Sequence, residues 1–170
     1  MRFESFIRDI PDFPKPGIIF KDITPLLMDA AAFDAALERM TKPYQTGSVD
    51  KIVAIESRGF IFGGAMARRL GCGLVLARKP GKLPADAIRE EYTLEYGTNA
   101  LEIHTDSIRE DERVVIVDDL LATGGTALAS IRLVERLKGN VVGLEFLIEL
   151  DFLKGRERIR QYPVRSQLHY

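Results

Sequence analysis

The sequence is poor in residues that would cross-link the chain or place it in a membrane. Its 170 residues include a single cysteine, Cys72, and no tryptophan. One cysteine cannot form a disulfide within the chain, so we expect a reducing, cytoplasmic location. Cys72 stands before an apolar run in LGCGLV, where a buried filler residue is favoured over a nucleophile. No apolar run approaches the ~20 residues of a membrane helix, and the charged N-terminus MRFESFIRDI does not resemble a signal peptide.

The sequence also lacks an excess of charge of either sign. It has 24 Lys and Arg residues against 25 Asp and Glu residues, which gives a net charge of -1. Proteins that bind nucleic acid usually carry a basic excess or stripe, so this balance argues against a nucleic-acid partner. We expect no membrane partner either. Without repeats, linkers or low-complexity segments, the chain predicts a single domain over residues 1–170.

Short apolar runs alternate with helical patterns along most of the chain. Strands are predicted at 51–55, 73–78, 114–117 and 140–150, and helices at 3–10, 31–40, 60–71, 127–138 and 154–159. The segments 91–96 and 100–105 alternate in polarity and are predicted to pair as a hairpin. This order predicts an α/β fold, in which a parallel twisted sheet carries helices on both faces.

One stretch, VVIVDDLLATGGTA (114–127), joins a buried strand to groups that bind ligands. The strand is predicted to end at Val117, so Asp118 and Asp119 would lie at the carboxyl edge of the sheet, where α/β folds bind ligands. Two glycines then allow close backbone approach, and the first N–H groups of the next helix attract a phosphate. The two acids would repel a phosphate alone. A ribose 5-phosphate fits better, because its diol can face the acids while its phosphate faces the loop.

Other interpretations of this stretch stay open at this point. A glycine turn between a strand and a helix is common, and two acids at a strand end can simply be solvated. The Walker pattern GxxxxGK[ST] is absent, which argues against a nucleotide triphosphatase. No GxGxxG pattern follows a strand, which argues against a dinucleotide-binding fold.

The stretch VVIVDDLLATGGT resembles the phosphoribosyl-pyrophosphate signature of the type I phosphoribosyltransferases. Further segments resemble the members of that family that act on adenine: PDFPKPGIIFKDITPLL, ESRGFIFG, RKPGKLP followed by YTLEYG, and FLKGRE. The resemblance covers nearly the whole chain. It implies the type I phosphoribosyltransferase fold, with a small base-binding hood from the N-terminal segment and a flexible hairpin loop. It also implies a purine-salvage reaction, in which adenine N9 takes the phosphoribosyl group of phosphoribosyl pyrophosphate and yields AMP and pyrophosphate.

The resemblance assigns the ribose and phosphate groups of the substrate to three segments. Asp118 and Asp119 would hold the ribose hydroxyls, and their charge would stabilise an oxocarbenium-like transition state. The loop that would bind the 5′-phosphate consists of Ala122, Thr123, Gly124, Gly125 and Thr126. The residues that would bind pyrophosphate are Glu56, Ser57, Arg58, Arg78, Lys79 and Lys82, with a cis peptide before Ser57. If the resemblance is set aside, Arg58 is equally consistent with an exposed surface charge. RKPGKLP is then equally consistent with a solvated basic loop.

The remaining roles implied by the resemblance fall on LEYG and GIIFKD. Glu95 would be catalytic by handling the proton at adenine N7, with Tyr96 in the same closing loop. Adenine would be bound by Ile19, Phe20 and Lys21, with the ring of Phe20 stacked on the base. An exposed hairpin tip and plain core packing are the alternatives for these segments. Neither His104 nor His169 matches a functional role, and both are expected to be structural.

The resemblance also implies a cofactor and partners. Magnesium is expected because transfer from pyrophosphate needs charge neutralisation. No cluster in the sequence resembles an all-protein metal cage, so the ion should be held mainly by the substrate pyrophosphate and water. The expected partners are adenine, phosphoribosyl pyrophosphate and a second copy of the chain in a homodimer. A phosphoribosyltransferase for another purine, and a regulator that binds nucleic acid, remain as alternatives. The segment FPKPGIIFKDI disfavours the first, and the balanced charge and the Glu95 loop disfavour the second.

Overall fold

The computed structural model describes residues 2–93 and 98–170, and its contacts divide the chain into two compact units. The first unit is Met1–Arg39 and the second is Met40–Tyr170. The single domain expected over residues 1–170 stays a prediction. None of the described helices is both long and apolar enough to span a bilayer.

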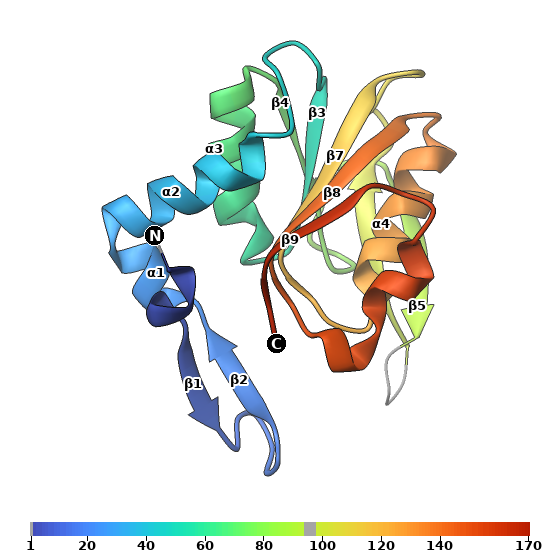
Figure 1. Ribbon diagram of the computed structural model, residues 1–170. Helices are drawn as coiled ribbons and strands as arrows, with labels where there is room; N and C mark the ends of the chain where they lie inside the picture. The colour runs from blue at the N-terminus through green and yellow to red at the C-terminus, as the bar shows by residue number, and fades with distance from the viewer. Residues whose placement is uncertain (1, 94–97) are drawn as a thin grey trace. The chain divides into compact units, whose positions relative to one another are not determined.

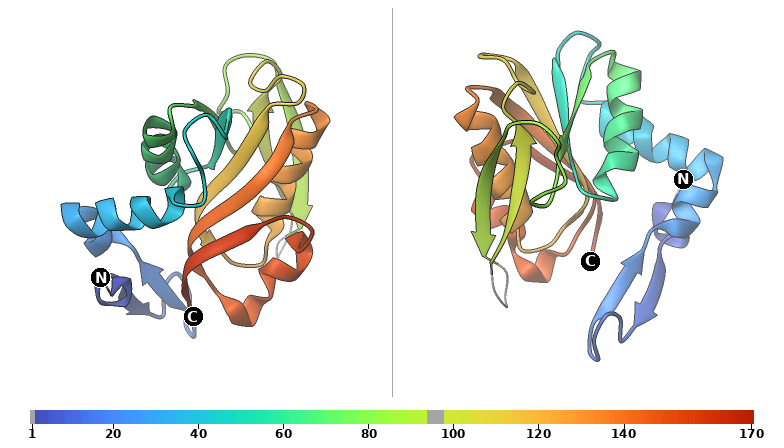
Figure 2. Two further views of the ribbon diagram at one scale, coloured as in Figure 1. Left: turned by 45° about the horizontal axis from the view of Figure 1, so that its top comes forward. Right: turned by 180° about the vertical axis from the view of Figure 1, so that it is seen from behind.

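The second unit is built on a parallel sheet of five strands in the order β4-β3-β7-β8-β9. The strands are β3 (Lys51–Ile55), β4 (Gly73–Ala77), β7 (Arg113–Leu121), β8 (Asn140–Glu149) and β9 (Val164–His169). Helices α3 (Gly59–Leu70) and α4 (Gly125–Arg136) cover opposite faces of this sheet (Figures 1 and 2). The α/β architecture predicted from the alternating pattern is therefore confirmed.

The apolar strand runs form the core of the second unit because both faces of the central strands are covered. In β7, the four residues Val114–Val117 are fully buried, and so are Ile52, Val53 and Ala54 of β3. Gly71 ends α3 in the left-handed conformation, as the glycine at that position predicts. Helix α4 begins at Gly125, closer to the glycine turn than the predicted start at residue 127.

Strand β7 continues further than the sequence predicts. The predicted end at Val117 is wrong, because β7 extends to Leu121 and pairs with β8 throughout. Asp118 lies opposite Phe146, and Leu120 lies opposite Ile148. The long neighbouring strand offers backbone partners beyond the apolar run, so the two acids belong to the sheet rather than to a loop after it.

β5 (Ala87–Thr93) and β6 (Thr98–His104) pair as the hairpin that the alternating segments predict, although β5 begins earlier than predicted. The hairpin packs against α4. The Glu90 carboxylate accepts hydrogen bonds from Arg132 Nη1 at 3.0 Å and Arg136 Nη1 at 3.4 Å. Arg136 Nη1 also donates to the Arg89 carbonyl at 2.6 Å. These bonds fasten the hairpin to α4. Glu95 and Tyr96 lie outside the described residues.

The first unit contains a β-hairpin and two helices. Its hairpin pairs β1 (Arg8–Pro11) with β2 (Ile19–Asp22), and its helices are α1 (Thr24–Met28) and α2 (Ala30–Thr41), which ends in the second unit. The helix predicted over residues 3–10 is wrong, because only a 3₁₀ turn forms at Phe3–Phe6 before β1 begins. Ion pairs link the two strands, from Arg8 to Asp22 at 2.6 Å and from Lys21 to Asp9 at 2.7 Å. Pairing with β2 therefore overrides the helical spacing of the apolar residues.

A buried polar group lies on β8 within the second unit. Glu145 is fully buried, and its Oε1 accepts hydrogen bonds from the Tyr44 hydroxyl at 2.9 Å and from Arg165 at 3.2 Å. Its Oε2 is the one buried side-chain oxygen without a hydrogen-bond partner among the described residues. A Cβ on Gly143 would lie 2.2 Å from the Tyr44 hydroxyl oxygen, so only glycine leaves room for that hydroxyl. Burial raises the pKa of Glu145 to about 7.

The stability of the chain should therefore depend on pH through Glu145. Between its ordinary pKa of 4.5 and about 7, the folded chain keeps a proton that the unfolded chain loses. The stability contributed by that proton is complete below about pH 4.5 and is lost as the pH rises to about 7, by up to ~3 kcal/mol. Glu145→Gln keeps the shape but removes the titration. We expect urea unfolding to show the variant gaining stability relative to wild type across this range.

The same change on an exposed carboxylate, Glu157→Gln, is the matched control for this experiment. It should show no such gain. Parallel pH profiles for Glu145→Gln and the wild-type chain would contradict the buried titration.

Candidate active site

The turn predicted to bind pyrophosphate and the acids predicted to bind ribose lie near the carboxyl ends of two neighbouring strands. The turn Glu56–Arg58 follows β3, and Asp118 and Asp119 lie in β7, which pairs with β3. A Cβ on Gly59 would lie 2.9 Å from Asp118 Oδ1, so the start of α3 lies directly against that carboxylate. The Glu56–Ser57 peptide is cis, as the resemblance implies.

The two acids of β7 form a buried, coupled pair. Asp118 is 9% exposed and Asp119 is 5% exposed. The Asp119 N–H donates to Asp118 Oδ1 at 2.8 Å, and Arg58 Nε lies 2.9 Å from Asp119 Oδ2. The site therefore holds two buried carboxylates, and one of them, Asp119, forms an ion pair with Arg58.

Burial governs how these two acids ionise. It raises the pKa of Asp118 well above the ordinary value, and the charge of Asp119 raises it further. Burial also raises the pKa of Asp119, although the Arg58 guanidinium opposes that rise. A ligand that donates hydroxyl hydrogens, or that develops positive charge here, would stabilise the ionised pair.

The loop after β7 has the features of an anion site. Gly124 has a φ of +79° and precedes α4 without any side-chain cap. The partial positive charge of the amino end of α4 thus meets the loop formed by Ala122, Thr123, Gly124, Gly125 and Thr126. Gly124 also touches another segment, because a Cβ on it would lie 2.5 Å from the Gly155 carbonyl oxygen. A phosphate at this loop would therefore bind just after the strand that carries the two acids.

The basic loop predicted to bind pyrophosphate is held against the turn after β3. Glu56 Oε2 accepts hydrogen bonds from the Lys79 N–H at 2.9 Å and from Arg78 Nε at 3.3 Å. Arg78 Nη1 also donates to the Lys82 carbonyl at 3.2 Å. Burial raises the pKa of Glu56, but the bonds from Lys79 and Arg78 outweigh it and lower that pKa overall. The structure therefore holds Arg78 and the backbone of Lys79 against Glu56, and Arg78 also bonds the Lys82 backbone.

The adenine candidates lie in the first unit, on or beside β2. Ile19 is 57% exposed, and the ring of Phe20 meets that of Phe13 edge-on at 5.2 Å. Lys21 Nζ lies 2.7 Å from Asp9 Oδ1. The structure describes these residues within their own unit, so their role in binding a base stays a prediction.

The sequence did not point to two structural features beside the site. Tyr92 of β5 lines a cavity of about 170 Å³ together with Gly125 and Arg158. Burial raises the pKa of Tyr92, and the charge of Asp118 raises it further. The other feature is the close approach of Gly155 to Ala122 and Gly124 in the loop after β7. In the sequence, only the motif FLKGRE drew attention to Gly155, and the motif alone does not indicate what that glycine contacts.

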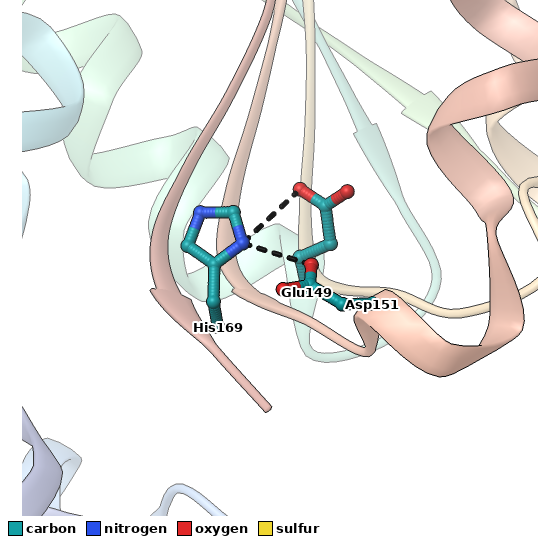
Figure 3. A group of neighbouring side chains, drawn as sticks. All are labelled: Glu149, Asp151 and His169. Carbon is teal, nitrogen blue, oxygen red and sulfur yellow. Dashed lines mark hydrogen bonds and ion pairs between the residues drawn. The ribbon is translucent and has the colours of Figure 1, made fainter.

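Glu149, Asp151 and His169 form a cluster whose ligand atoms lie within 4.8 Å of one another (Figure 3). His169 Nδ1 lies 2.9 Å from Asp151 Oδ1 and 4.0 Å from Glu149 Oε2. The Glu149 carboxylate already accepts bonds from Arg156 on both oxygens. A metal ion would have to compete with that guanidinium, so the geometry favours a structural hydrogen-bonded cluster. His104 is also hydrogen-bonded, since its Nε2 lies 3.4 Å from the Ala85 nitrogen.

Known proteins resemble this chain over its full length. The model of the phosphoribosyl transferase domain family matches residues 25–169. An adenine phosphoribosyltransferase of Halothermothrix orenii is 56% identical over 168 residues, which cover 99% of each chain. The crystal structure of adenine phosphoribosyltransferase from Thermoanaerobacter pseudethanolicus matches with a TM-score of 0.95 and 54% identity, and covers 99% of this chain and 98% of that chain. The enzyme of Saccharomyces cerevisiae, complexed with adenine and an imino-altritol bisphosphate, matches with a TM-score of 0.87 and 39% identity over 98% of this chain and 96% of that chain.

The buried charge of Asp118 should lower the stability of the unliganded chain. Asp118→Asn keeps the acceptor for the Asp119 N–H but cannot ionise. We expect the melting temperature of the variant to exceed that of wild type at pH 8, by about 2–4 °C for each kcal/mol regained. The difference should shrink toward pH 4, where the wild-type carboxyl is protonated in the folded chain. A melting temperature at or below that of wild type at both pH values would contradict this expectation.

Proposed function

The chain belongs to the phosphoribosyl transferase domain family, and we infer that it transfers the 5-phosphoribosyl group of phosphoribosyl pyrophosphate to adenine N9, giving AMP and pyrophosphate. This is the purine-salvage activity for which its full-length relatives are named. The observation that carries the proposal is the buried pair Asp118 and Asp119, followed directly by the glycine loop that opens α4. That order matches a ribose whose diol and 5′-phosphate are bound side by side.

The acids bind the ribose and stabilise the charge that develops during transfer. Asp118 and Asp119 accept hydrogen bonds from the 2′- and 3′-hydroxyls. As the bond from C1′ to pyrophosphate breaks, positive charge grows on the ribose, and the fixed negative charge nearby lowers the free energy of that state. Burial strengthens this effect because little water screens the pair.

The phosphate groups are divided between two regions of the site. The 5′-phosphate accepts hydrogen bonds from backbone N–H groups of the glycine loop and from the hydroxyls of Thr123 and Thr126. The leaving pyrophosphate is bound by the turn Glu56–Arg58 and by the basic side chains of Arg78, Lys79 and Lys82. Support comes from the bonds of Glu56, which draw the basic loop to the turn.

The base is bound by the hood of the first unit. Ile19, Phe20 and Lys21 supply backbone groups and the stacking ring, as the resemblance implies. The adenine bound by the yeast relative supports the choice of base. Glu95, which lies outside the described residues, handles the proton at N7 as N9 becomes bonded.

Magnesium completes the substrate. The chemistry of the site fits a hard cation at Asp118, whose carboxylate lies against the start of α3 beside the proposed pyrophosphate region, whereas Asp119 already pairs with Arg58. Glu56 is less suited, because its carboxylate is bonded to Arg78 and to the Lys79 N–H. When bound, magnesium would neutralise charge on the pyrophosphate, and the pyrophosphate and water would be its main ligands.

A homodimer in the cytoplasm is also part of the proposal. Exposed apolar side chains gather on α3 and the edge strand β4: Ile61 is 43% exposed, Leu74 is 43% and Leu76 is 37%. Exposed apolar residues of this kind favour a protein contact, and the resemblance implies a homodimer. A single-chain mass in sedimentation equilibrium would contradict this part of the proposal.

The reaction is tested directly by mixing the chain with magnesium, phosphoribosyl pyrophosphate and one nucleobase at a time. We expect AMP from adenine and a selectivity over hypoxanthine of roughly 10⁴, because hypoxanthine presents a carbonyl where adenine has an amino donor. The doubly substituted Asp118→Asn, Asp119→Asn chain is the control and should be folded but nearly inactive. Comparable turnover of both bases would move the assignment to another purine. Salt-sensitive binding of RNA or DNA without AMP formation would favour the regulator instead.

Glu95→Gln separates a catalytic loop residue from a surface acid. The amide still forms hydrogen bonds but cannot transfer a proton, so we expect turnover to fall by about 10²–10⁴. The affinity for phosphoribosyl pyrophosphate and the melting temperature should stay near wild type. Glu91→Gln, on the exposed part of the same hairpin, is the matched control. Unchanged turnover in Glu95→Gln would remove the catalytic role.

A further inference from the structure

Two glycines far apart in the sequence meet backbone to backbone at the phosphate loop. A Cβ on Gly155 would lie 2.1 Å from the Ala122 carbonyl oxygen and 2.8 Å from the Gly124 nitrogen. From the other side, a Cβ on Gly124 would lie 2.5 Å from the Gly155 carbonyl oxygen. Gly124 has a left-handed φ, but Gly155 does not. Space alone therefore requires glycine at position 155.

The segment that carries Gly155 is fastened to the last two strands of the sheet. Arg156 directs Nε to Glu149 Oε1 at 2.9 Å and Nη1 to the Val164 carbonyl at 2.8 Å. Its Nη2 bonds the second oxygen of Glu149, which also accepts from the Ser166 hydroxyl at 2.6 Å. Glu149 is 4% exposed and lies at the end of β8. The guanidinium thus ties the residue after Gly155 to both β8 and β9.

The start of the same segment has a second attachment. The Asp151 N–H donates to the Tyr170 carbonyl at 2.8 Å, and the Asp151 carboxylate lies 2.9 Å from His169 Nδ1 (Figure 3). The segment Asp151–Ile159 is therefore held at its start and centre by β8 and the end of β9. Its middle, at Gly155, contacts the loop that contains the adjacent glycines Gly124 and Gly125. Adjacent glycines give a backbone wide conformational freedom.

We propose that the segment Asp151–Ile159, which we call the buttress, sets the position of the 5′-phosphate loop, with Gly155 and Arg156 as positioning residues for phosphoribosyl pyrophosphate. The proposal rests on the proposed function. Binding of a phosphate by backbone N–H groups depends on their alignment, and a loop that is already aligned loses little entropy on binding. The Gly155 backbone blocks one side of the loop, and Arg156 fixes that backbone to the sheet.

A purely structural role for the buttress would show as lost stability rather than as lost affinity for one substrate. Gly155→Ala puts a methyl group against the loop without straining its own backbone. Gly139→Ala is the matched control, since its Cβ would lie 2.8 Å from Ile108 and 2.9 Å from Val134, past the carboxyl end of α4. Both variants add one crowded methyl group, but only the first acts on the phosphate loop.

The test compares KM for each substrate, kcat, melting temperature and the Kd for ribose 5-phosphate by calorimetry. We expect Gly155→Ala to raise the KM for phosphoribosyl pyrophosphate and the Kd for ribose 5-phosphate by about 10- to 100-fold. The KM for adenine should change much less. Gly139→Ala should lower the melting temperature and leave both affinities near wild type. Wild-type affinity for ribose 5-phosphate in a folded Gly155→Ala chain would overturn the proposal.

Substitution of Arg156 decides the matter if Gly155→Ala does not fold. Arg156→Lys keeps the charge beside Glu149 but loses the fork, and Arg156→Gln loses both. The proposal is supported if the affinity for ribose 5-phosphate falls in both variants, and less in Arg156→Lys than in Arg156→Gln. Wild-type affinity in both variants overturns it. Ribose 5-phosphate binding does not require catalysis. A wild-type chain that binds ribose 5-phosphate without forming AMP would therefore refute the proposed function. The role of the buttress would still be decided by comparing the ribose 5-phosphate affinity of the variants with that of wild type.

Discussion

The site depends on a strand that continues through two acids. The pairing of β7 with β8 carries Asp118 and Asp119 into the interior, although the apolar run of β7 ends at Val117. An isolated carboxylate would be costly in that position, and the cost appears as the raised pKa of Asp118. Arg58 limits it by pairing with Asp119. The chain thus retains an unfavourable charge at the position that the proposed function assigns to the ribose, which is a common compromise between stability and function.

Close backbone contacts fix the rest of the site around that pair. Gly59 lets the start of α3 touch Asp118, and Gly155 lets the buttress touch the loop at Gly124. Both contacts need a missing side chain more than an unusual conformation, since neither residue has a left-handed φ. The phosphate loop is therefore connected to β7 at one end, to α4 at the other, and to the buttress along its side.

Local signals in the sequence are sufficient to predict the sheet and the motifs. The apolar runs, the glycine that ends α3, and the alternating hairpin segments each reflect neighbours within a few residues. Contacts between distant segments could not be predicted in this way. The end of β7 depends on β8, and the strand pairing of Arg8–Pro11 depends on β2. Tyr44 and Glu145 are 101 positions apart, so no local pattern shows their bond. The motifs predict which residues form the site, but the ion pair between Arg58 and Asp119 is visible only in the folded structure.

The central claim is that the acids of β7 and the loop before α4 bind a ribose and its 5′-phosphate as one unit. A crystal structure of the chain with AMP tests that claim most directly. The account predicts the ribose hydroxyls within hydrogen-bond distance of Asp118 and Asp119, and the phosphate against the backbone N–H groups between Thr123 and Thr126. A nucleotide bound with its phosphate away from this loop, or with its ribose hydroxyls turned from both carboxylates, would contradict the account.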